Sequence, residues 1–166
     1  MLEQSINEWI ENFLNIPTPT LNNLPPCPFA KQALISNKIV INQLRPLSQL
    51  SMKEYFIAEI ENYTYHWPKG KEVVILGCEA DLISAEDLEE CVDITTEKFL
   101  SERGFVALED HPDEEERVKD LIFNQGTYAL ILLQEAEKLD KARRILDKQN
   151  YYKNWDKQYY KDVVDR

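Results

Sequence analysis

The stretch Glu72-Val73-Val74-Ile75-Leu76-Gly77-Cys78 decides the fold of this chain. It is rich in β-branched residues, which favour strands. Its apolar residues run on without alternating with polar ones, which is typical of a strand covered on both faces. Helices on each side of a sheet provide such cover, so the stretch predicts the α/β class.

Predicted elements alternate on both sides of this stretch. Capping residues support the two predicted helices: Ser51 with Glu54 for the first, and Ser84 for the second. The expected order is a strand at 38–44, a helix at 51–63, the strand at 72–78, a helix at 85–103 and a strand at 105–108. This order predicts a single-domain α/β sandwich with a three- or four-stranded sheet. A ferredoxin-like α+β fold is the alternative, if a further strand lies elsewhere in the chain.

Both ends of the chain are expected to be helical. An apolar stripe predicts a helix over 3–15, and a proline-punctuated loop follows at 17–28. The C-terminal third is predicted to be helical, with a strand at 127–133 as the alternative for its short apolar run. Residues 1–148 are expected to form the α/β domain, and residues 149–166 an aromatic helix or tail packed on it.

Charge narrows the class of partner. The chain has 166 residues, a normal hydrophobic fraction of 43% and a formal net charge of −11. Nucleic acid and anionic membrane surfaces require a basic face, so the charge disfavours both and leaves a small-molecule substrate or a protein partner. No apolar run is long enough to span a membrane, and no secretory signal is visible.

Cysteine and glycine usage adds two expectations. Cys27, Cys78 and Cys91 are widely spaced and form no CxxC motif, which predicts reduced thiols in the cytoplasm. The four glycines form neither GxGxxG nor a P-loop, so the usual phosphate-binding backbone motifs are missing and the cofactor is left open.

The stretch Leu24-Pro25-Pro26-Cys27-Pro28-Phe29-Ala30-Lys31 is the first candidate functional segment. A helix starting near residue 29 would place Cys27 beside a helix N-terminus, which lowers a thiol pKa. His111, just past a predicted strand, is a candidate general base for that thiol, with Asp113 or Asp110 orienting the imidazole. Cys27, His111 and Asp113 are therefore candidate catalytic residues for hydrolysis or group transfer. The alternative for Cys27 is a buried cysteine in a rigid loop.

Two further functions stay open at this point. Cys27, Cys78 and His111 together would make a mixed metal site, although their spacing matches no known ligand pattern. A non-catalytic binding or assembly module would act through the acidic surface and the aromatic segment 151–160.

The ordered motifs Cys27-Pro28-Phe29-Ala30 and His111-Pro112-Asp113, followed by Asn124 and the Leu-rich run 130–136, resemble a bacterial family of domain-of-unknown-function proteins. The resemblance spans residues 5–142. It supports the choice of Cys27 and His111 as site residues and implies no established reaction. The chain departs from the family at Glu114-Glu115-Glu116-Arg117, where the family favours an aromatic and a glycine-bearing loop, and at Ile131 and Gln134, where it favours His and Arg. A shared site would therefore be altered here.

Overall fold

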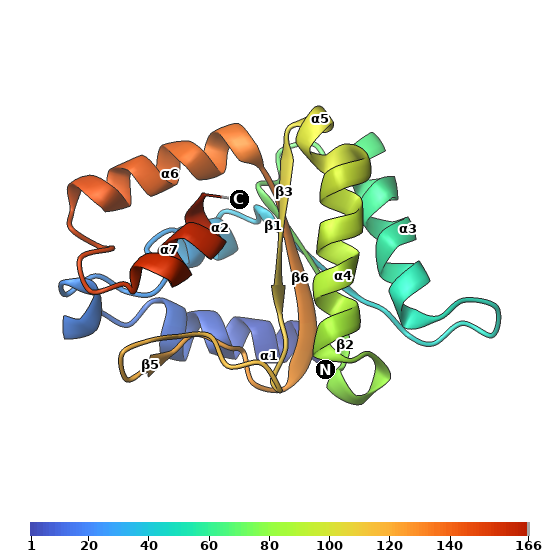
Figure 1. The fold of residues 1–166 in the computed structure, drawn as a ribbon, viewed down its shortest axis with the longest axis horizontal. Coiled ribbons are helices and arrows are strands. Elements are labelled where there is room, and N and C mark those ends of the chain that lie inside the picture. The colour runs from blue at the N-terminus through green and yellow to red at the C-terminus, as the bar shows by residue number, and fades with distance from the viewer. Residues whose placement is uncertain (166) are drawn as a thin grey trace.

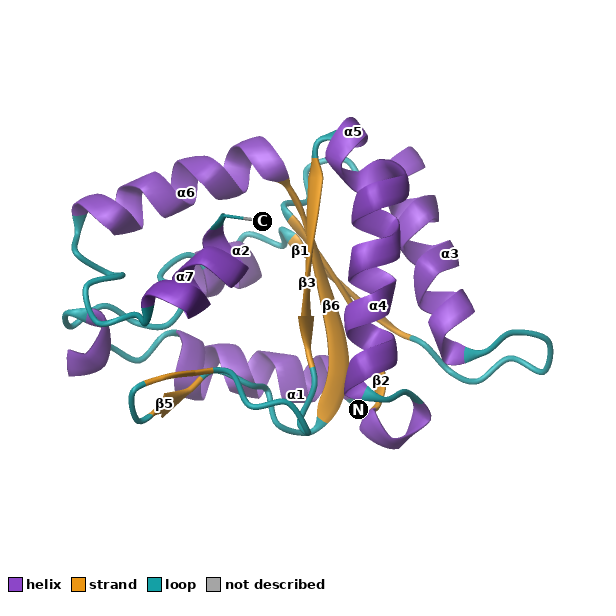
Figure 2. Cartoon of the chain, in the orientation of Figure 1, coloured by secondary structure: helices purple, strands orange, loops and turns teal. Residues whose placement is uncertain are grey.

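A computed structural model describes residues 1–165 of the chain (Figures 1 and 2). The strands are β1 (Ile39–Gln43), β2 (Val73–Glu79), β3 (Phe105–Asp110), β4 (Arg117–Val118), β5 (Leu121–Ile122) and β6 (Tyr128–Glu135). The α-helices are α1 (Leu2–Trp9), α2 (Ala30–Ile35), α3 (Met52–Tyr65), α4 (Ala85–Thr95), α5 (Ser101–Arg103), α6 (Ala136–Lys148) and α7 (Lys157–Val164). Shorter 3₁₀ or π-helical segments lie at Ile10–Leu14, Pro19–Leu21, Ala80–Leu82 and Thr96–Leu100.

The main sheet has four strands in the order β1-β2-β6-β3. β1 pairs with β2 in parallel, whereas β6 runs antiparallel to both of its neighbours, β2 and β3. The chain is thus a single-domain α/β fold with a mixed sheet, as the alternating order of elements predicts. The strand order and the parallel β1–β2 pair exclude the ferredoxin-like alternative.

Helices cover both faces of the sheet, as the uninterrupted apolar run in β2 predicts. Successive residues of a strand point to opposite faces. One face, against α3 and α4, holds the larger buried cluster, in which Val74, Leu76 and Ile131 take part. The other face, against α1 and α2, holds a smaller one that includes Ile75 and Leu130. Figure 1 shows α3 and α4 on one side of the sheet and α1, α2 and α6 on the other.

The local signals for the early helices are confirmed. Ser51 and Glu54 form both hydrogen bonds of a capping box at the start of α3. The Ser84 side chain accepts a hydrogen bond from the N–H of Asp87 at the start of α4. Gly104 ends the 85–103 helical region with φ 78°, in the left-handed region that glycine tolerates best.

The C-terminal third differs from the predicted helix. Residues 128–135 form strand β6, so the strand alternative was correct for this run and the helix starts only at Ala136. The physical reason lies in the long-range pairing of β6 with β2 on one side and β3 on the other. The small β4–β5 hairpin was also missed, because strands of two residues have no readable period.

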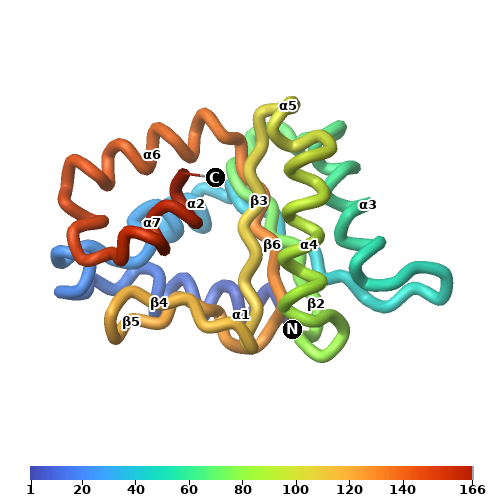
Figure 3. Tube along the Cα trace, in the orientation of Figure 1, coloured from blue at the N-terminus to red at the C-terminus, as the bar shows by residue number. Residues whose placement is uncertain are grey.

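The C-terminal segment packs against the proline-rich loop. The Tyr151 hydroxyl donates a hydrogen bond of 2.5 Å to the carbonyl of Pro26, and the Asn154 amide donates one of 3.0 Å to the carbonyl of Thr20. Figure 3 shows these two distant parts of the chain side by side. Tyr152 and Trp155 lie in the segment before α7, and the centroids of their rings are 5.0 Å apart. The predicted tail ends at residue 166, which lies outside the described residues.

Gly77 is required where α1 approaches β2. A Cβ atom built on Gly77 would lie 2.7 Å from Cδ2 of Leu130 and 2.9 Å from Cδ2 of Leu2, and both leucines are fully buried. We expect Gly77→Ala to lower the free energy of unfolding by about 1–3 kcal/mol, because neither leucine can move without repacking the core. Urea denaturation measures this change. In a double-mutant cycle with Leu2→Ala, the two costs should sum to more than the cost of the double variant, and strictly additive costs would contradict the proposed crowding.

Candidate functional site

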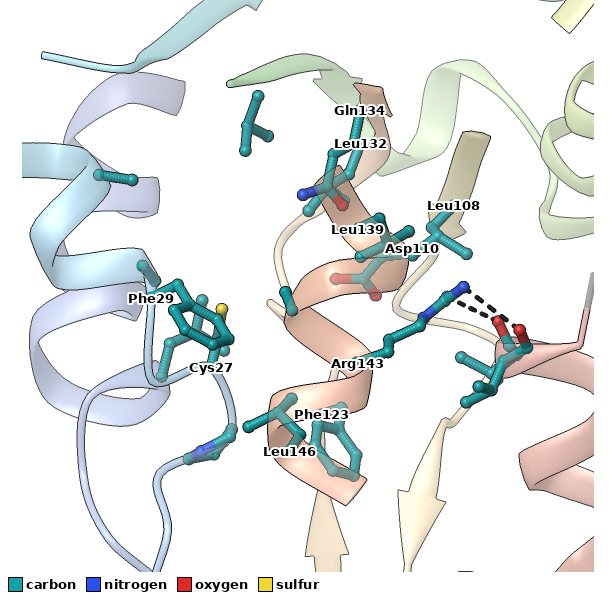
Figure 4. Close-up of a pocket in the computed structure, with 18 of the residues that line it drawn as sticks. Cys27, Phe29, Leu108, Asp110, Phe123, Leu132, Gln134, Leu139, Arg143 and Leu146 are labelled. Carbon is teal, nitrogen blue, oxygen red and sulfur yellow. Dashed lines mark hydrogen bonds between the residues drawn. The ribbon is translucent and has the colours of Figure 1, made fainter. Parts of the chain in front are cut away.

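A cavity of about 670 Å³ lies between the α1–α2 side of the sheet and the C-terminal segment (Figure 4). Strand side chains such as Ile75, Leu108 and Leu132 form its floor. Its walls come from α1 with the following turn, the proline-rich loop with α2, helix α6, the loop after β3, and the segment 151–164. Most of the lining side chains are apolar.

The cavity exists because the two faces of the sheet are packed unequally. On the α3–α4 face, Val74, Ile131 and Leu133 are at most 3% exposed in their clusters. On the opposite face, Leu132 is only half-buried, and so is Val73 on the neighbouring strand. Because α6 leaves the sheet directly at the end of β6 and runs away from it, the apolar floor is left without a tightly packed helix above it (Figure 1).

Cys27 lines this cavity from the proline-rich loop. Its N–H donates a hydrogen bond of 2.9 Å to the carbonyl of Leu14, which fixes the loop against the helical turn that follows α1. Burial raises the pKa of the Cys27 thiol, and hydrogen bonds from the N–H groups of Phe29 and Ala30 only partly oppose that shift. The environment therefore favours the neutral thiol over the thiolate expected from a nucleophilic cysteine.

His111 is a buried backbone-binding residue, 3% exposed. Its Nε2 lies 3.2 Å from the carbonyl oxygen of Ala80 and 3.0 Å from that of Ile83, and its Nδ1 accepts a hydrogen bond of 3.1 Å from the N–H of Asp113. Carbonyls only accept, so this pattern assigns the proton to Nε2 and leaves Nδ1 as the acceptor. Nε2 thus joins the loop after β3 to the turn after β2, while Nδ1 is bonded within its own loop.

The structure does not bring His111 to Cys27. His111 is not among the described residues that line the cavity, and its ring faces Ile83, which belongs to the α3–α4 cluster. Asp113 does not orient the ring either: its side chain is 86% exposed, its carboxylate oxygen is 3.9 Å from Nδ1, and that nitrogen is already bonded by the backbone. The predicted Cys27–His111–Asp113 arrangement is not formed.

The predicted metal site from Cys27, Cys78 and His111 is not assembled. Cys78 is fully buried on the α3–α4 face, whereas Cys27 packs with the cluster of the opposite face. Across residues 1–165, no group of three or more His, Cys, Asp or Glu residues is arranged to hold a metal ion. Burial raises the pKa of both Cys78 and Cys91 to about 12. Cys91 is a small, fully buried core residue of α4.

Asp110 is the functional candidate that sequence reasoning placed in the wrong role. It was expected to orient His111, but its carboxylate bonds Asn124 and Gln125 instead, and it lines the cavity with Leu108, two residues before it on β3. The chain has 30 acidic residues, and Asp110 is the only buried one among residues 1–165, with 8% exposure. The period-two pattern of Val106, Leu108 and Asp110 was the signal that could have identified it.

Asn124 holds the Asp110 carboxylate in place. Its Nδ2 donates a hydrogen bond of 2.7 Å to Asp110 Oδ1 and another of 2.9 Å to the carbonyl of Glu114, while its Oδ1 accepts one of 2.8 Å from the N–H of Glu116. The N–H of Gln125 donates a hydrogen bond of 2.8 Å to Asp110 Oδ2. The loop between β3 and β6 is therefore built around this carboxylate.

Arg143 connects the cavity wall to the end of the chain. Its guanidinium donates hydrogen bonds to the carbonyls of Val163 (2.8 Å) and Val164 (3.3 Å), where α7 ends (Figure 4). A cation at a helix C-terminus satisfies carbonyls that lack partners within the helix. This clamp holds α7 beside the cavity.

Comparison with models of protein families, with curated proteins and with solved structures gives no match. The resemblance carried by Cys-Pro-Phe-Ala and His-Pro-Asp therefore stays a prediction. In the described residues, no helix has the length and apolarity that a membrane span demands.

The reactivity of Cys27 tests the thiolate hypothesis. Because burial raises the pKa of this thiol, we expect iodoacetamide to label Cys27 more slowly at neutral pH than it labels cysteine in a short peptide, with a rate that climbs as the pH rises. Mass spectrometry of the labelled protein, with Cys27→Ser as the site control, measures this rate. Labelling faster than the peptide at neutral pH would restore the nucleophile hypothesis.

Replacement of His111 should affect stability. We expect His111→Phe to lower the free energy of unfolding by at least about 2 kcal/mol, because it leaves the bonded carbonyls and the N–H of Asp113 without their partner. Asp113→Asn is the matched control and should leave the unfolding midpoint nearly unchanged, since that side chain is exposed. Chemical denaturation compares the two variants; equal stability of His111→Phe and wild type would contradict the assigned role.

Proposed function

We propose that this chain is a binding protein for a small, mainly apolar organic molecule, which occupies the cavity between the sheet and the C-terminal segment. The observation that supports this most directly is the unequal packing of the sheet. The cavity of about 670 Å³ falls within the range of roughly 300–1,000 Å³ typical of small-molecule sites. Its apolar lining with few polar groups is also typical of such sites.

The composition of the floor supports an apolar ligand. Apolar side chains of β2, β3 and β6 are left half-buried there, and a molecule that covers them removes their surface from water. Each square ångström of apolar surface so buried contributes about 25 cal/mol. This gain is the driving force that we assign to binding.

A catalytic role for Cys27 and His111 stays a prediction with less support. The two residues lie on opposite sides of the sheet, and the thiol is held neutral by burial. The assembly role predicted for the aromatic segment also has less support. Tyr151 and Trp155 are in the cluster around Leu21, so those rings are used within the chain.

We also infer a cytoplasmic location. All three cysteines are free, and Cys78 and Cys91 are buried in the apolar core as reduced thiols. The net charge of −11 supports a ligand or protein partner rather than nucleic acid.

Filling the cavity tests the proposed binding. We expect the neutral dye Nile red to bind wild type saturably with a rise in fluorescence, and Leu132→Trp to weaken that binding at least about tenfold, because the indole takes the space of the ligand. Ala142→Trp fills the same cavity from α6 and serves as a second variant if Leu132→Trp folds poorly.

Ile35→Trp is the matched control. Ile35 is 69% exposed on α2 and is not part of the cavity lining, so the added indole should leave dye binding unchanged. Unfolding temperatures with and without dye provide an independent readout, since a ligand that binds only the folded state raises them. Unchanged dye affinity in both cavity-filling variants would refute the proposal.

A further inference from the structure

Asp110 is the one buried carboxylate, within the described residues, in a cavity whose lining is mainly apolar. On the cavity face of β3 it follows Leu108, and its register partner on β6 is Leu130. Of the 30 acidic residues, it alone is buried among residues 1–165. Burial of a carboxyl group without an ionic partner costs free energy, so its presence in the cavity calls for a functional explanation.

The protein supplies only neutral partners to this group. Its two oxygens accept one hydrogen bond each, from the Asn124 amide and from the N–H of Gln125. A carboxylate can accept about four, so each oxygen keeps acceptor capacity. Within residues 1–165, no Lys or Arg forms an ion pair with Asp110. Burial accordingly raises the pKa of Asp110, although the two hydrogen bonds and the electrostatic effect of the neighbouring His111 oppose the shift.

The other cations around the cavity are already engaged. Lys138 pairs with Glu135, and Lys141 pairs with Glu137. The Arg143 guanidinium donates to the carbonyls that end α7. An anionic ligand would have to compete for these groups, whereas a cationic ligand would meet an acceptor that lacks a positive partner.

We propose that the ligand is an organic amine whose apolar body lies on the Leu108–Leu132 floor and whose ammonium group pairs with Asp110. This inference rests on the proposed function and adds the chemistry of the head group. A desolvated ammonium–carboxylate pair favours the charged forms of both partners and fixes the orientation of the ligand. The net charge of −11 adds a long-range attraction for cations.

Three ligands of equal chain length test the head group. Decylammonium, decanol and decanoate should each be measured by displacement of Nile red from wild type at neutral pH, below the concentrations at which they form micelles. We expect decylammonium to bind at least about tenfold more tightly than decanol, and decanoate more weakly than either, because a close charge pair in a water-excluded site adds this much or more.

Asp110→Asn tests the residue. It should reduce the affinity for decylammonium to near that for decanol, while decanol keeps its wild-type affinity and so shows that the cavity is intact. Asp113→Asn removes an equal charge from an exposed position and should leave the preference for ammonium unchanged.

The outcomes separate this inference from the proposed function. Binding of decanol without any preference for decylammonium overturns the amine proposal alone. An Asp110→Asn variant that keeps the full preference also overturns it, as does wild type that binds decanoate best. Failure of all three ligands and of Nile red to bind overturns the binding function together with the amine proposal.

Discussion

The rest of the structure depends on the insertion of β6 between β2 and β3. This strand pairs with β2 over residues 128–134 and with β3 over residues 130–135, and β3 joins the sheet only through it. Its side chains also divide the interior: Ile131 and Leu133 complete the α3–α4 cluster, while Leu130 belongs to the α1–α2 cluster. Since α6 starts at the residue directly after β6, the same strand determines where the cavity wall begins.

The two sides of the sheet serve different purposes. The α3–α4 side is closed by two capped helices and carries most of the buried apolar residues, which makes it the main source of stability. The opposite side is closed by α1 near Gly77 but bounded elsewhere by α6 and the C-terminal segment. That segment is held by the apolar cluster around Leu21 and by hydrogen bonds such as those from Tyr151 to Pro26 and from Arg143 to the end of α7.

The sequence predicted the elements that depend on local interactions and missed those that depend on residues far apart in the chain. Ser51 and Ser84 act within one helical turn, so their patterns were sufficient to place the starts of α3 and α4. The assignment of 128–135 depended on pairing with residues up to 61 positions away, which no local pattern contains. The cavity could not be predicted for the same reason, because its lining comes from segments spread over nearly the whole chain.

The candidate site shows the same limit at the level of two adjacent residues. Cys27 and His111 were predicted to form one site because cysteine and histidine are reactive residue types. In the structure the sheet separates them. Asp110 is the last residue of β3 and lines the cavity, whereas His111 follows the strand and bonds the turn after β2. The motif that appeared catalytic in the sequence is thus structural through its histidine, and the residue before it carries the charge that a ligand would meet.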